Sequence, residues 1–433
     1  MDYTEIVAQL RKWRDNLIQG RVNCIPSPFD RFSRDFVGIE QGKLYAVSAN
    51  TKVGKTQIAN FIFVYNTVWY AFCHPDKVRL KIMYFNLEES EMNITLRFMS
   101  HLLYRYTKGQ VRKDIKALKS TRSWAPVDSE VLDALEQDPY KAIMEFYNKV
   151  VEFRPERNPI GISKAIKSFC EEHGKVTTKK MEITNDFGQR QTVDVFESYE
   201  PDDRDLYFIP IIDHLGLVSP ESGSSLKQAM DLLSANLVKY RNRYNCSPVM
   251  IIQQAMSQES LDNIKAKKMR PSVVGLGDSK TVGRDVDMLF GLFGPFRHEL
   301  PSFGDYDITR FKDHFRVFEV ILNREGEANT MVPLWFDGAT NSFSELPKPP
   351  WVTGTKQPGV DCSSCENCSY RDCCDLKPWY ELSEKYNQMN NIVAKGWKKK
   401  RNTAHWMSRF VSNITKGRKG KSETWSLRIY VLD

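Results

Sequence analysis

The most constraining feature of this chain is a short run between an apolar segment and a helical one. Residues 49–56 read Ala-Asn-Thr-Lys-Val-Gly-Lys-Thr and follow the apolar residues 44–47. In a phosphate-binding loop, backbone N–H groups cradle phosphates, a lysine reaches the β- and γ-phosphates, and a hydroxyl binds Mg²⁺. The following residues suit a helix whose N-terminus faces the anion. We therefore predict a nucleotide-binding site with Mg²⁺ that uses Ala49, Asn50, Thr51, Lys52, Val53, Gly54, Lys55 and Thr56.

Composition sets the class of protein. The chain has 433 residues, of which 41% are hydrophobic and 27% charged, as in soluble globular proteins. That length suffices for one large α/β domain with appendages. The sequence has no apolar run of the roughly 18–20 residues that a membrane span needs, and its first residues do not form a secretory signal. We expect a cytoplasmic protein with reduced cysteines, and no membrane partner.

The net charge of +8 belongs to one end of the chain. Residues 391–433 hold eleven Lys and Arg and two acidic residues, so the remaining 390 residues are close to neutral. A basic tail can bind nucleic acid through counterion release. A solvated end without a ligand is the alternative interpretation.

Short apolar runs separated by helical stretches predict the core. Such runs are typical of strands buried on both faces of a mainly parallel sheet, and their alternation with helices predicts an α/β, doubly wound P-loop domain. The predicted strands cover residues 43–49, 79–87, 206–213, 248–254, 286–293 and 316–323.

The other segments complete the predicted organisation. An amphipathic helix over 3–19 precedes the core domain, which we place at 21–346 after an N-terminal segment 1–20. An insertion covers about 105–200, with a basic stretch at 108–122, a helical stretch at 129–172 and a hairpin formed by 177–184 and 190–197. A Pro- and Gly-containing linker at 347–361 leads to a Cys-rich, basic region at 362–433.

Polar residues at the ends of the predicted strands are candidates for chemistry. Asp213 ends one apolar run, where a carboxylate can bind Mg²⁺, although a helix N-cap is the alternative. Glu88 and Glu89 end another run, and one of them can activate water if its strand lies beside the phosphate loop. The alternative is that both cap the helix that begins near Ser90. Gln254 ends a third run and can sense the γ-phosphate. Arg324 follows a fourth and can act on a neighbour's nucleotide.

Five of these features occur in the order found in hexameric replicative DNA helicases of the DnaB type, within the RecA-like superfamily. The loop at 49–56 is similar to that family's variant, which also begins with alanine, and Asn86-Leu87-Glu88 resembles its Ser-Leu-Glu, whose glutamate is the catalytic base. Residues 212–215, Ile-Asp-His-Leu, resemble its Ile-Asp-Tyr-Leu. Residues 252–254, Ile-Gln-Gln, resemble its Leu-Ser-Gln. Arg270-Pro271 and the Asp-Val-Asp at 285–287 resemble its Arg-Pro and Asp-Ala-Asp stretches.

The resemblance implies a ring of six subunits with ATP at the interfaces, single-stranded DNA in the channel, and primase, a loader or other replisome proteins as partners. In this interpretation Lys55 binds the phosphates, and Thr56 and Asp213 hold Mg²⁺. Glu88 is the catalytic base, and Gln254 couples the nucleotide state to DNA. Arg324 is the arginine finger, which acts on the nucleotide of a neighbouring subunit. The family has Lys-x-Arg at the finger, whereas this chain has Leu322-Asn323-Arg324. Only the helix at 3–19 precedes the motor, a short form similar to helicases of large DNA phages, which would place it in the host cytoplasm.

The loop after Gln254 is the predicted contact with DNA. Residues 263–270 include Lys265, Lys267, Lys268 and Arg270, which can follow phosphates without reading bases. A solvated surface loop is the alternative.

A cysteine cluster is the remaining motif. Five cysteines, spaced C-x₂-C-x₂-C-x₄-C-C, predict a metal site, with Zn²⁺ as the first choice. An iron–sulfur cluster and free thiols stay open. The cysteines are Cys362, Cys365, Cys368, Cys373 and Cys374.

Two other functions remain open from the sequence. A RecA-type recombinase or KaiC-like regulatory ATPase would bind and hydrolyse ATP without unwinding DNA. A non-hydrolysing nucleic-acid adaptor would depend on the Cys-rich region.

Overall fold

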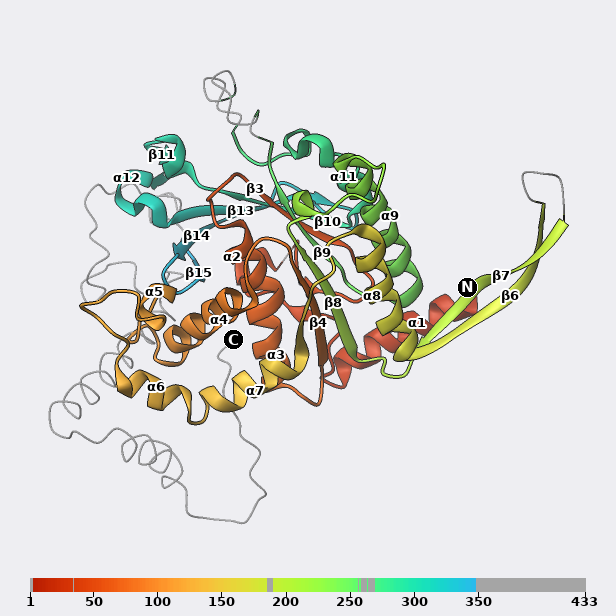
Figure 1. Ribbon diagram of the computed structural model, residues 1–433, viewed down its shortest axis with the longest axis horizontal. Coiled ribbons are helices and arrows are strands. Elements are labelled where there is room, and N and C mark those ends of the chain that lie inside the picture. The colour runs from red at the N-terminus through yellow and green to blue at the C-terminus, as the bar shows by residue number, and fades with distance from the viewer. Residues whose placement is uncertain are drawn as a thin grey trace, which may run out of the picture. The chain divides into compact units, whose positions relative to one another are not determined.

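The computed structural model describes residues 3–33, 35–184, 190–255, 257, 263 and 269–347. The predicted DNA contacts Lys265, Lys267 and Lys268 and all five clustered cysteines lie outside these residues. Most described residues belong to one compact unit, formed by 1–127, 134–303 and 307–346. Its architecture is a central sheet with helices on both faces (Figure 1).

The central sheet has nine strands among the described residues, in the order β15-β14-β13-β10-β3-β9-β8-β4-β5. The six strands from β10 to β5 are parallel, whereas β13, β14 and β15 pair antiparallel at the other end. The strands are β3 Tyr45–Ala49, β4 Arg79–Asn86, β5 Val151–Arg154, β8 Leu206–Asp213, β9 Val249–Gln253, β10 Met288–Phe293, β13 Phe315–Asn323, β14 Met331–Asp337 and β15 Ser342–Glu345.

The α-helices and the strands outside the central sheet complete the fold. The helices are α1 Tyr3–Ile18, α2 Lys55–Asn60, α3 Asn66–Cys73, α4 Glu91–Tyr106, α5 Ile115–Leu118, α6 Ser129–Leu135, α7 Tyr140–Val150, α8 Pro159–Glu172, α9 Leu226–Tyr244, α11 Val282–Asp285 and α12 Ile308–Phe311. The strands are β1 Ile25–Pro26, β2 Gly38–Ile39, β6 Gly174–Thr184, β7 Arg190–Pro201, β11 Ser302–Phe303 and β12 Tyr306–Asp307.

Alternation along the central strands divides the core between the two faces of the sheet. Ala46 and Phe85 belong to a buried apolar cluster with residues of α8 and α9. Tyr45 and Tyr84 point to the opposite face, where the Tyr45 ring lies 5.4 Å from the ring of Phe63. Because side chains of a strand alternate between faces, strands that are apolar throughout must be covered twice. The prediction of a mainly parallel, doubly covered α/β sheet is confirmed.

The predicted insertion is interrupted by a strand of the main sheet. The sequence pattern predicts a helical stretch over 129–172, but β5 lies inside it and pairs in parallel with β4. That part of the prediction is wrong because β5 has only four residues, two of them charged, and directly follows α7. The helix α8 also packs in the core through Ile162 and Ile166. The parts that extend from the sheet are therefore the loop-rich segment 107–127 and the hairpin β6–β7.

The hairpin is longer than predicted. Its strands pair from Gly174↔Pro201 to Thr184↔Arg190, with an irregularity at Thr177/Thr178. Figure 1 shows it projecting from the body of the unit. Its base is anchored, since the Tyr199 ring lies 5.1 Å from that of Tyr244 on α9.

Candidate nucleotide-binding site

The predicted phosphate loop connects the central strand β3 to α2. Gly54 has φ 109°, in the left-handed region that favours glycine, and α2 begins at the next residue. Ala49, where the general motif has glycine, is the last residue of β3 and pairs with β9 and β10. It is fully buried. A methyl group is compatible with this extended position, so the departure from glycine does not disturb the loop.

Lys55 is the first residue of α2 and therefore stands where the helix N-terminus attracts anions. Burial lowers the pKa of its amine, while the carboxylates of Asp213 and Glu88 act in the opposite direction. The lysine thus lies close to both acidic residues that the sequence singled out.

Asp213 lies at the end of β8, in contact with the phosphate loop. The hydroxyl of Thr56 donates to its Oδ1 at 3.1 Å, and the phenol of Tyr84 donates to its Oδ2 at 2.8 Å. The residue is 1% exposed. Burial raises the pKa of its carboxyl to about 6, and the hydrogen bond from Tyr84 and the charge of Lys55 oppose the shift.

The donors around Asp213 fit a magnesium ion. Mg²⁺ prefers oxygen ligands, usually one or two protein groups together with phosphate oxygens and water. The Thr56 hydroxyl and the Asp213 carboxylate provide such oxygens next to the phosphate loop. Sequence analysis did not identify Tyr84, which fixes the other carboxylate oxygen and is itself 3.0 Å from Oδ1 of Asn60.

The structure separates the roles of Glu88 and Glu89. The Glu89 carboxylate accepts two hydrogen bonds from Arg97 on α4, at 3.1 and 2.9 Å. The Glu88 side chain is 48% exposed and lies 3.7 Å from Nε2 of His214. Burial lowers the pKa of His214 to about 4, so that this imidazole is neutral near pH 7. Glu88 is therefore the carboxylate that remains available to a water molecule.

The strand carrying these glutamates is not a neighbour of β3. The strands β9 and β8 lie between β3 and β4. Asn86 pairs with Asp213, and the amide of Leu87 donates to the carbonyl of Asp213 at 2.7 Å. Parallel strands end at one edge of a sheet, so Glu88 approaches the phosphate loop through the adjacent end of β8.

Gln254 connects the phosphate-loop strand to the next loop. Its backbone N–H donates to the carbonyl of Ala49 at 3.0 Å, and its amide donates to the Ser48 hydroxyl at 2.6 Å and to the Ser272 carbonyl at 3.2 Å. The preceding Gln253, which the sequence analysis did not select, donates to the Thr51 hydroxyl at 2.8 Å. The two glutamines thus hold both ends of the segment 48–51.

Arg316 is a third residue that sequence reasoning missed. It lies on β13 and is 2% exposed. Its Nε donates to the carbonyl of Val53 in the phosphate loop at 2.7 Å, and Nη1 donates to the carbonyls of Asp313 and Phe315 at 2.6 and 2.9 Å. The guanidinium also lies 5.1 Å from the ring centroid of Phe336. An arginine within a mainly apolar strand was the available signal.

The contact with Arg316 has a consequence for phosphate binding. A phosphate loop needs its N–H groups directed at the anion, so its carbonyls must find partners elsewhere. Arg316 provides a charge-assisted partner for the Val53 carbonyl. Arg297 similarly donates to the carbonyl of Thr51.

Arg324 lies at the other end of the sheet's parallel strands. It follows β13 next to Met288, whose partner on β3 is Tyr45, the first residue of that strand. The phosphate loop begins after the last residue of β3. Arg324 and the phosphate loop of the same chain therefore lie at opposite ends of the parallel strands, too far apart for contact.

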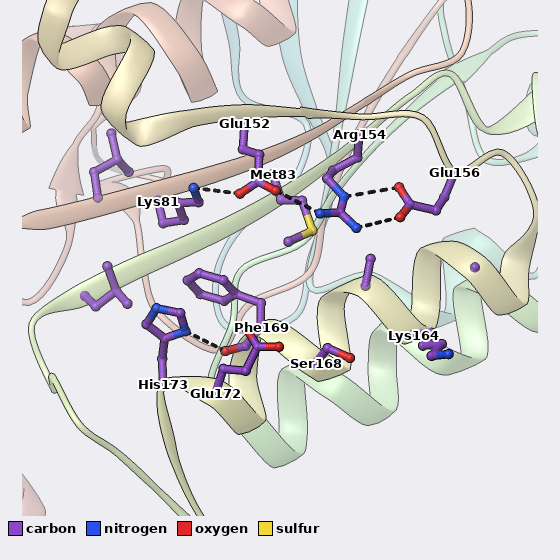
Figure 2. A pocket seen from close by; sticks show the side chains of 14 residues that line it. Lys81, Met83, Glu152, Arg154, Glu156, Lys164, Ser168, Phe169, Glu172 and His173 are labelled. Carbon is purple, nitrogen blue, oxygen red and sulfur yellow. Dashed lines mark hydrogen bonds and ion pairs between the residues drawn. The ribbon is translucent and has the colours of Figure 1, made fainter.

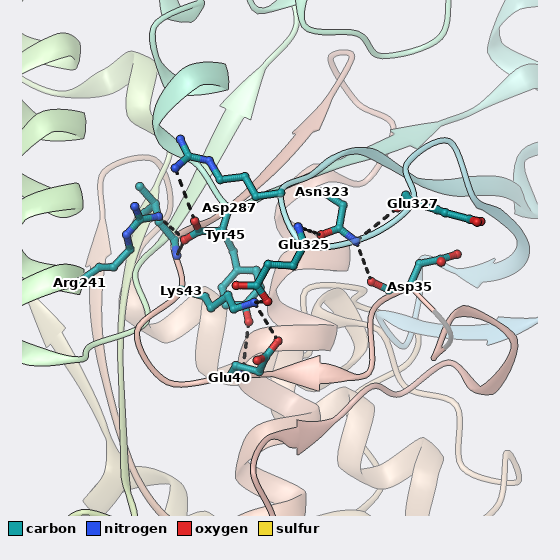
Figure 3. Close-up of polar contacts among 11 residues, drawn as sticks. Asp35, Glu40, Lys43, Tyr45, Arg241, Asp287, Asn323, Glu325 and Glu327 are labelled. Carbon is teal, nitrogen blue, oxygen red and sulfur yellow. Dashed lines mark hydrogen bonds and ion pairs between the residues drawn. The ribbon is translucent and has the colours of Figure 1, made fainter. Parts of the chain in front are cut away.

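A polar network that includes Arg241 and Asp287 lies at this edge of the sheet (Figure 3). Nη2 of Arg324 donates to the carbonyl of Arg284, and its Nη1 lies 3.9 Å from the Asp287 carboxylate. Asp287 also forms an ion pair with Arg241 and accepts from the N–H of Leu44 at 2.8 Å. The Arg324 side chain is 48% exposed despite these contacts, so its guanidinium is accessible from outside the chain.

Among the predicted DNA contacts, Arg270 lies within the described residues. It forms an ion pair with Glu319 on β13, whose side chain is 3% exposed. Burial raises the pKa of the Glu319 carboxyl. Arg270 therefore compensates a buried acid, a role that the sequence analysis did not anticipate.

The described residues contain no group of three or more His, Cys, Asp or Glu side chains arranged to hold a metal. Within the same ranges no helix combines the length and the apolar character needed to cross a bilayer. The cysteine cluster is outside them, and its metal site stays a prediction.

A pocket of about 660 Å³ lies between α8 and the β4–β5 edge of the sheet (Figure 2). Its charged side chains largely neutralise one another, since Lys81 and Arg154 both pair with Glu152, at 2.7 and 2.9 Å. Arg154 also pairs with Glu156 at 2.6 Å. None of the predicted site residues lines this pocket.

Comparisons with known proteins address the fold. No family model and no curated protein matches the sequence. The structure is similar to a solved helicase structure described as an "ATPase Domain", with a TM-score of 0.55 and 14% identity over 80% of this chain and 99% of that one. It is also similar to a structure described as "a DnaB-Like Replicative Helicase And Its Interactions With Primase", with a TM-score of 0.52 and 14% identity over 79% of this chain and 66% of that one. The chain therefore has the RecA-like fold of the ATPase domain of DnaB-type replicative helicases.

Proposed function

We propose that this protein is an ATP-driven helicase that moves along single-stranded DNA as a ring of identical subunits, with six as the expected number. The observation that carries the proposal is the convergence of Lys55, Thr56, Asp213 and Glu88 at one edge of a sheet that has the DnaB-type fold. These residues come from three separate strand ends, and each has the chemistry that ATP hydrolysis requires.

In this mechanism Lys55 binds the β- and γ-phosphates, and the phosphate-loop amides surround them. Thr56 and Asp213 would hold Mg²⁺, which would supply positive charge next to the phosphates when bound. Glu88 accepts the proton of the attacking water, because Glu89 is engaged by Arg97. Tyr84 keeps the Asp213 carboxylate in one orientation.

Arg324 completes a neighbouring subunit's site. Its position at the opposite edge from Lys55 supports action between chains rather than within one. Without the lysine of the family pattern, Arg324 supplies the positive charge from that strand. A site divided between subunits requires an assembly in which the edge with Lys55 of one subunit meets the edge with Arg324 of the next.

The helix α1 supports the same assembly. Its large apolar side chains are exposed, with Trp13 at 49% and Leu17 at 65%. Their spacing forms a stripe suited to a second surface. We propose that α1 docks on the adjacent subunit, as the linker helix does in the family that the sequence resembles.

The coupling of hydrolysis to movement runs through Gln254. Its side chain donates hydrogen bonds both to Ser48, on β3, and to Ser272, which follows the predicted DNA loop. A change at the γ-phosphate that moves β3 would thereby reach Lys265, Lys267 and Lys268, which we propose contact DNA. Primase is named for one structure of this fold, and a primase, a loader or other replisome proteins are proposed partners here.

The decisive experiment measures ATP hydrolysis with and without single-stranded DNA, with Lys55→Ala as the control. We expect strong stimulation by DNA that the control lacks, followed by unwinding of a forked duplex. Stimulated hydrolysis without unwinding would favour a recombinase or regulatory ATPase. Binding without hydrolysis would reject Glu88 and Arg324 as catalytic residues and favour the adaptor function.

Metal analysis tests the cysteine cluster. We propose that four of its five thiolates bind Zn²⁺, and we expect about one zinc per chain in protein purified without chelators. A zinc content near zero, with no iron or sulfide, would reject a metal site.

A further inference from the structure

We propose that residues 107–124, between α4 and α6, form a second surface for single-stranded nucleic acid, separate from the predicted DNA loop. The segment holds six Lys and Arg and one acidic residue, although the first 390 residues of the chain are close to neutral. The identity of the ligand rests on the proposed function, whereas the surface itself rests on the hydrogen bonds and the exposure of this segment's side chains.

The segment has a defined conformation that its own side chains maintain. Asp114 caps α5 by accepting from the N–H of Ala117 at 2.7 Å. Its other carboxylate oxygen accepts from Arg122 at 2.6 Å, so the single acid of the segment is neutralised within it. The Ser120 hydroxyl accepts from the N–H of Val127 at 3.0 Å. The cations are therefore presented by a structured loop.

The segment is also attached to the nucleotide-binding edge of the sheet. Arg112 donates two hydrogen bonds to Asp337, the last residue of β14, at 2.7 and 2.6 Å. The Ser100 hydroxyl on α4 lies 3.0 Å from the Ala339 carbonyl and also contacts the Lys113 carbonyl at 2.5 Å. Figure 1 shows α5 near α4 and the β14–β15 pair. Because β14 runs in the same direction as β3, its end lies at the edge that carries the phosphate loop.

The exposed side chains match the requirements of an unpaired strand. Lys108, Lys116 and Lys119 are exposed, and the indole of Trp124 is 82% exposed, more than any other large apolar side chain among the described residues. Sequence-independent binding of single strands combines cations along the backbone with aromatic rings on which bases stack. An acidic polypeptide would use the cations but gain little from a free indole face.

The experiment compares two triple variants of the full-length protein that lose the same charge. One replaces Lys108, Lys116 and Lys119 with Gln. The matched control replaces Lys141, Lys149 and Lys167, which are exposed on α7 and α8. Binding of a long fluorescent oligothymidylate is measured from low to moderate salt for the wild type and both variants.

We expect the first variant to bind about tenfold more weakly near 0.1 M salt, and the slope of log K against log[salt] to fall by about two. The control should bind like the wild type, and ATP hydrolysis without DNA should be unchanged in both. Trp124→Ala should weaken binding about tenfold at any salt concentration, while Trp124→Phe retains most of the affinity.

The outcomes separate this proposal from the proposed function. If the wild type does not bind the oligonucleotide, the translocase function fails. If the wild type binds and both triple variants lose affinity equally, the loss reflects overall charge and the second surface is rejected. A response to Lys108, Lys116 and Lys119 but not to Trp124, with equal competition by polyglutamate, would assign the surface to an acidic polypeptide and also overturn the proposal.

Discussion

The two edges of the parallel sheet differ in what their polar residues are free to do. At the edge where β3 ends, Lys55, Thr56 and Asp213 lie together and form the proposed site for ATP and Mg²⁺. At the edge where β3 begins, Arg241 pairs with Asp287 and Lys43 pairs with Glu325 (Figure 3). Arg324 lies beside this network, 3.9 Å from the Asp287 carboxylate. The first edge has the phosphate loop, and the second has Arg324. In the proposed function a complete catalytic site uses both edges, contributed by two copies.

The largest effect on ATP hydrolysis should come from variants that each remove the key residue of one edge. Arg324→Ala is expected to lower DNA-stimulated hydrolysis about 10³-fold, as removal of an arginine finger does. Lys55→Ala should abolish it. A mixture of the two variants should recover measurable hydrolysis, since the Lys55→Ala chain still supplies Arg324 to a neighbour with an intact phosphate loop. Absence of recovery in mixed assemblies, verified by co-purification of two tags, would place both residues in one chain's site.

The next effect tests which glutamate is the base. Glu88→Gln should lower hydrolysis by about 10²–10⁴-fold and leave ATP affinity nearly unchanged, because the amide cannot accept the proton. Glu89→Gln should have a smaller effect, since Glu89 holds Arg97 rather than facing the site. Single-turnover hydrolysis and nucleotide titration measure the two quantities. The reverse ranking of the two variants would transfer the role to Glu89.

A matched pair of buried arginines sharpens the comparison. Arg316→Lys should weaken ATP binding about tenfold, because one ammonium cannot bond the Val53 carbonyl and the carbonyls near Asp313 together. Arg241→Lys disturbs a buried ion pair at the other edge and should lower stability without changing ATP affinity. Calorimetric titration and thermal unfolding without nucleotide check both. Equal ATP affinity in the two variants would reduce Arg316 to a structural residue.

The smallest expected effect is a pH dependence of stability. Burial lowers the pKa of His101 to about 3, and its ring lies between those of Phe61 and Tyr65. The unfolded chain binds a proton below about pH 6.5 while the folded chain does not, so stability is present above that pH and is lost as the pH falls. His101 alone contributes up to about 1.4 kcal/mol per pH unit to the slope of the unfolding free energy against pH. His101→Gln should remove about one proton from the slope of unfolding free energy between pH 6 and 4, relative to wild type. An unchanged slope in urea titrations would contradict this.

The sequence determined the central strands well because their apolar runs are distinctive. The predicted strand at 206–213 coincides with β8, and the others differ by up to two residues at an end. The short β5 escaped because its four residues lie between helical patterns on both sides, and β14 has a proline at Pro333. These strands exist because the edges of the existing sheet offer hydrogen-bond partners.

Local motifs also identified Lys55, Thr56, Asp213 and the Glu88–Glu89 pair, since each follows a recognisable strand. The sequence favoured Glu88 over Glu89 only through the family resemblance, because it could not show that Glu89 binds Arg97 from the next helix. Nor could it predict that Arg316 meets Val53, 263 residues away, or that Arg324 lies at the opposite edge from the phosphate loop. Strand order and register bring such residues together or keep them apart, and both are set by packing between segments that are distant in the chain.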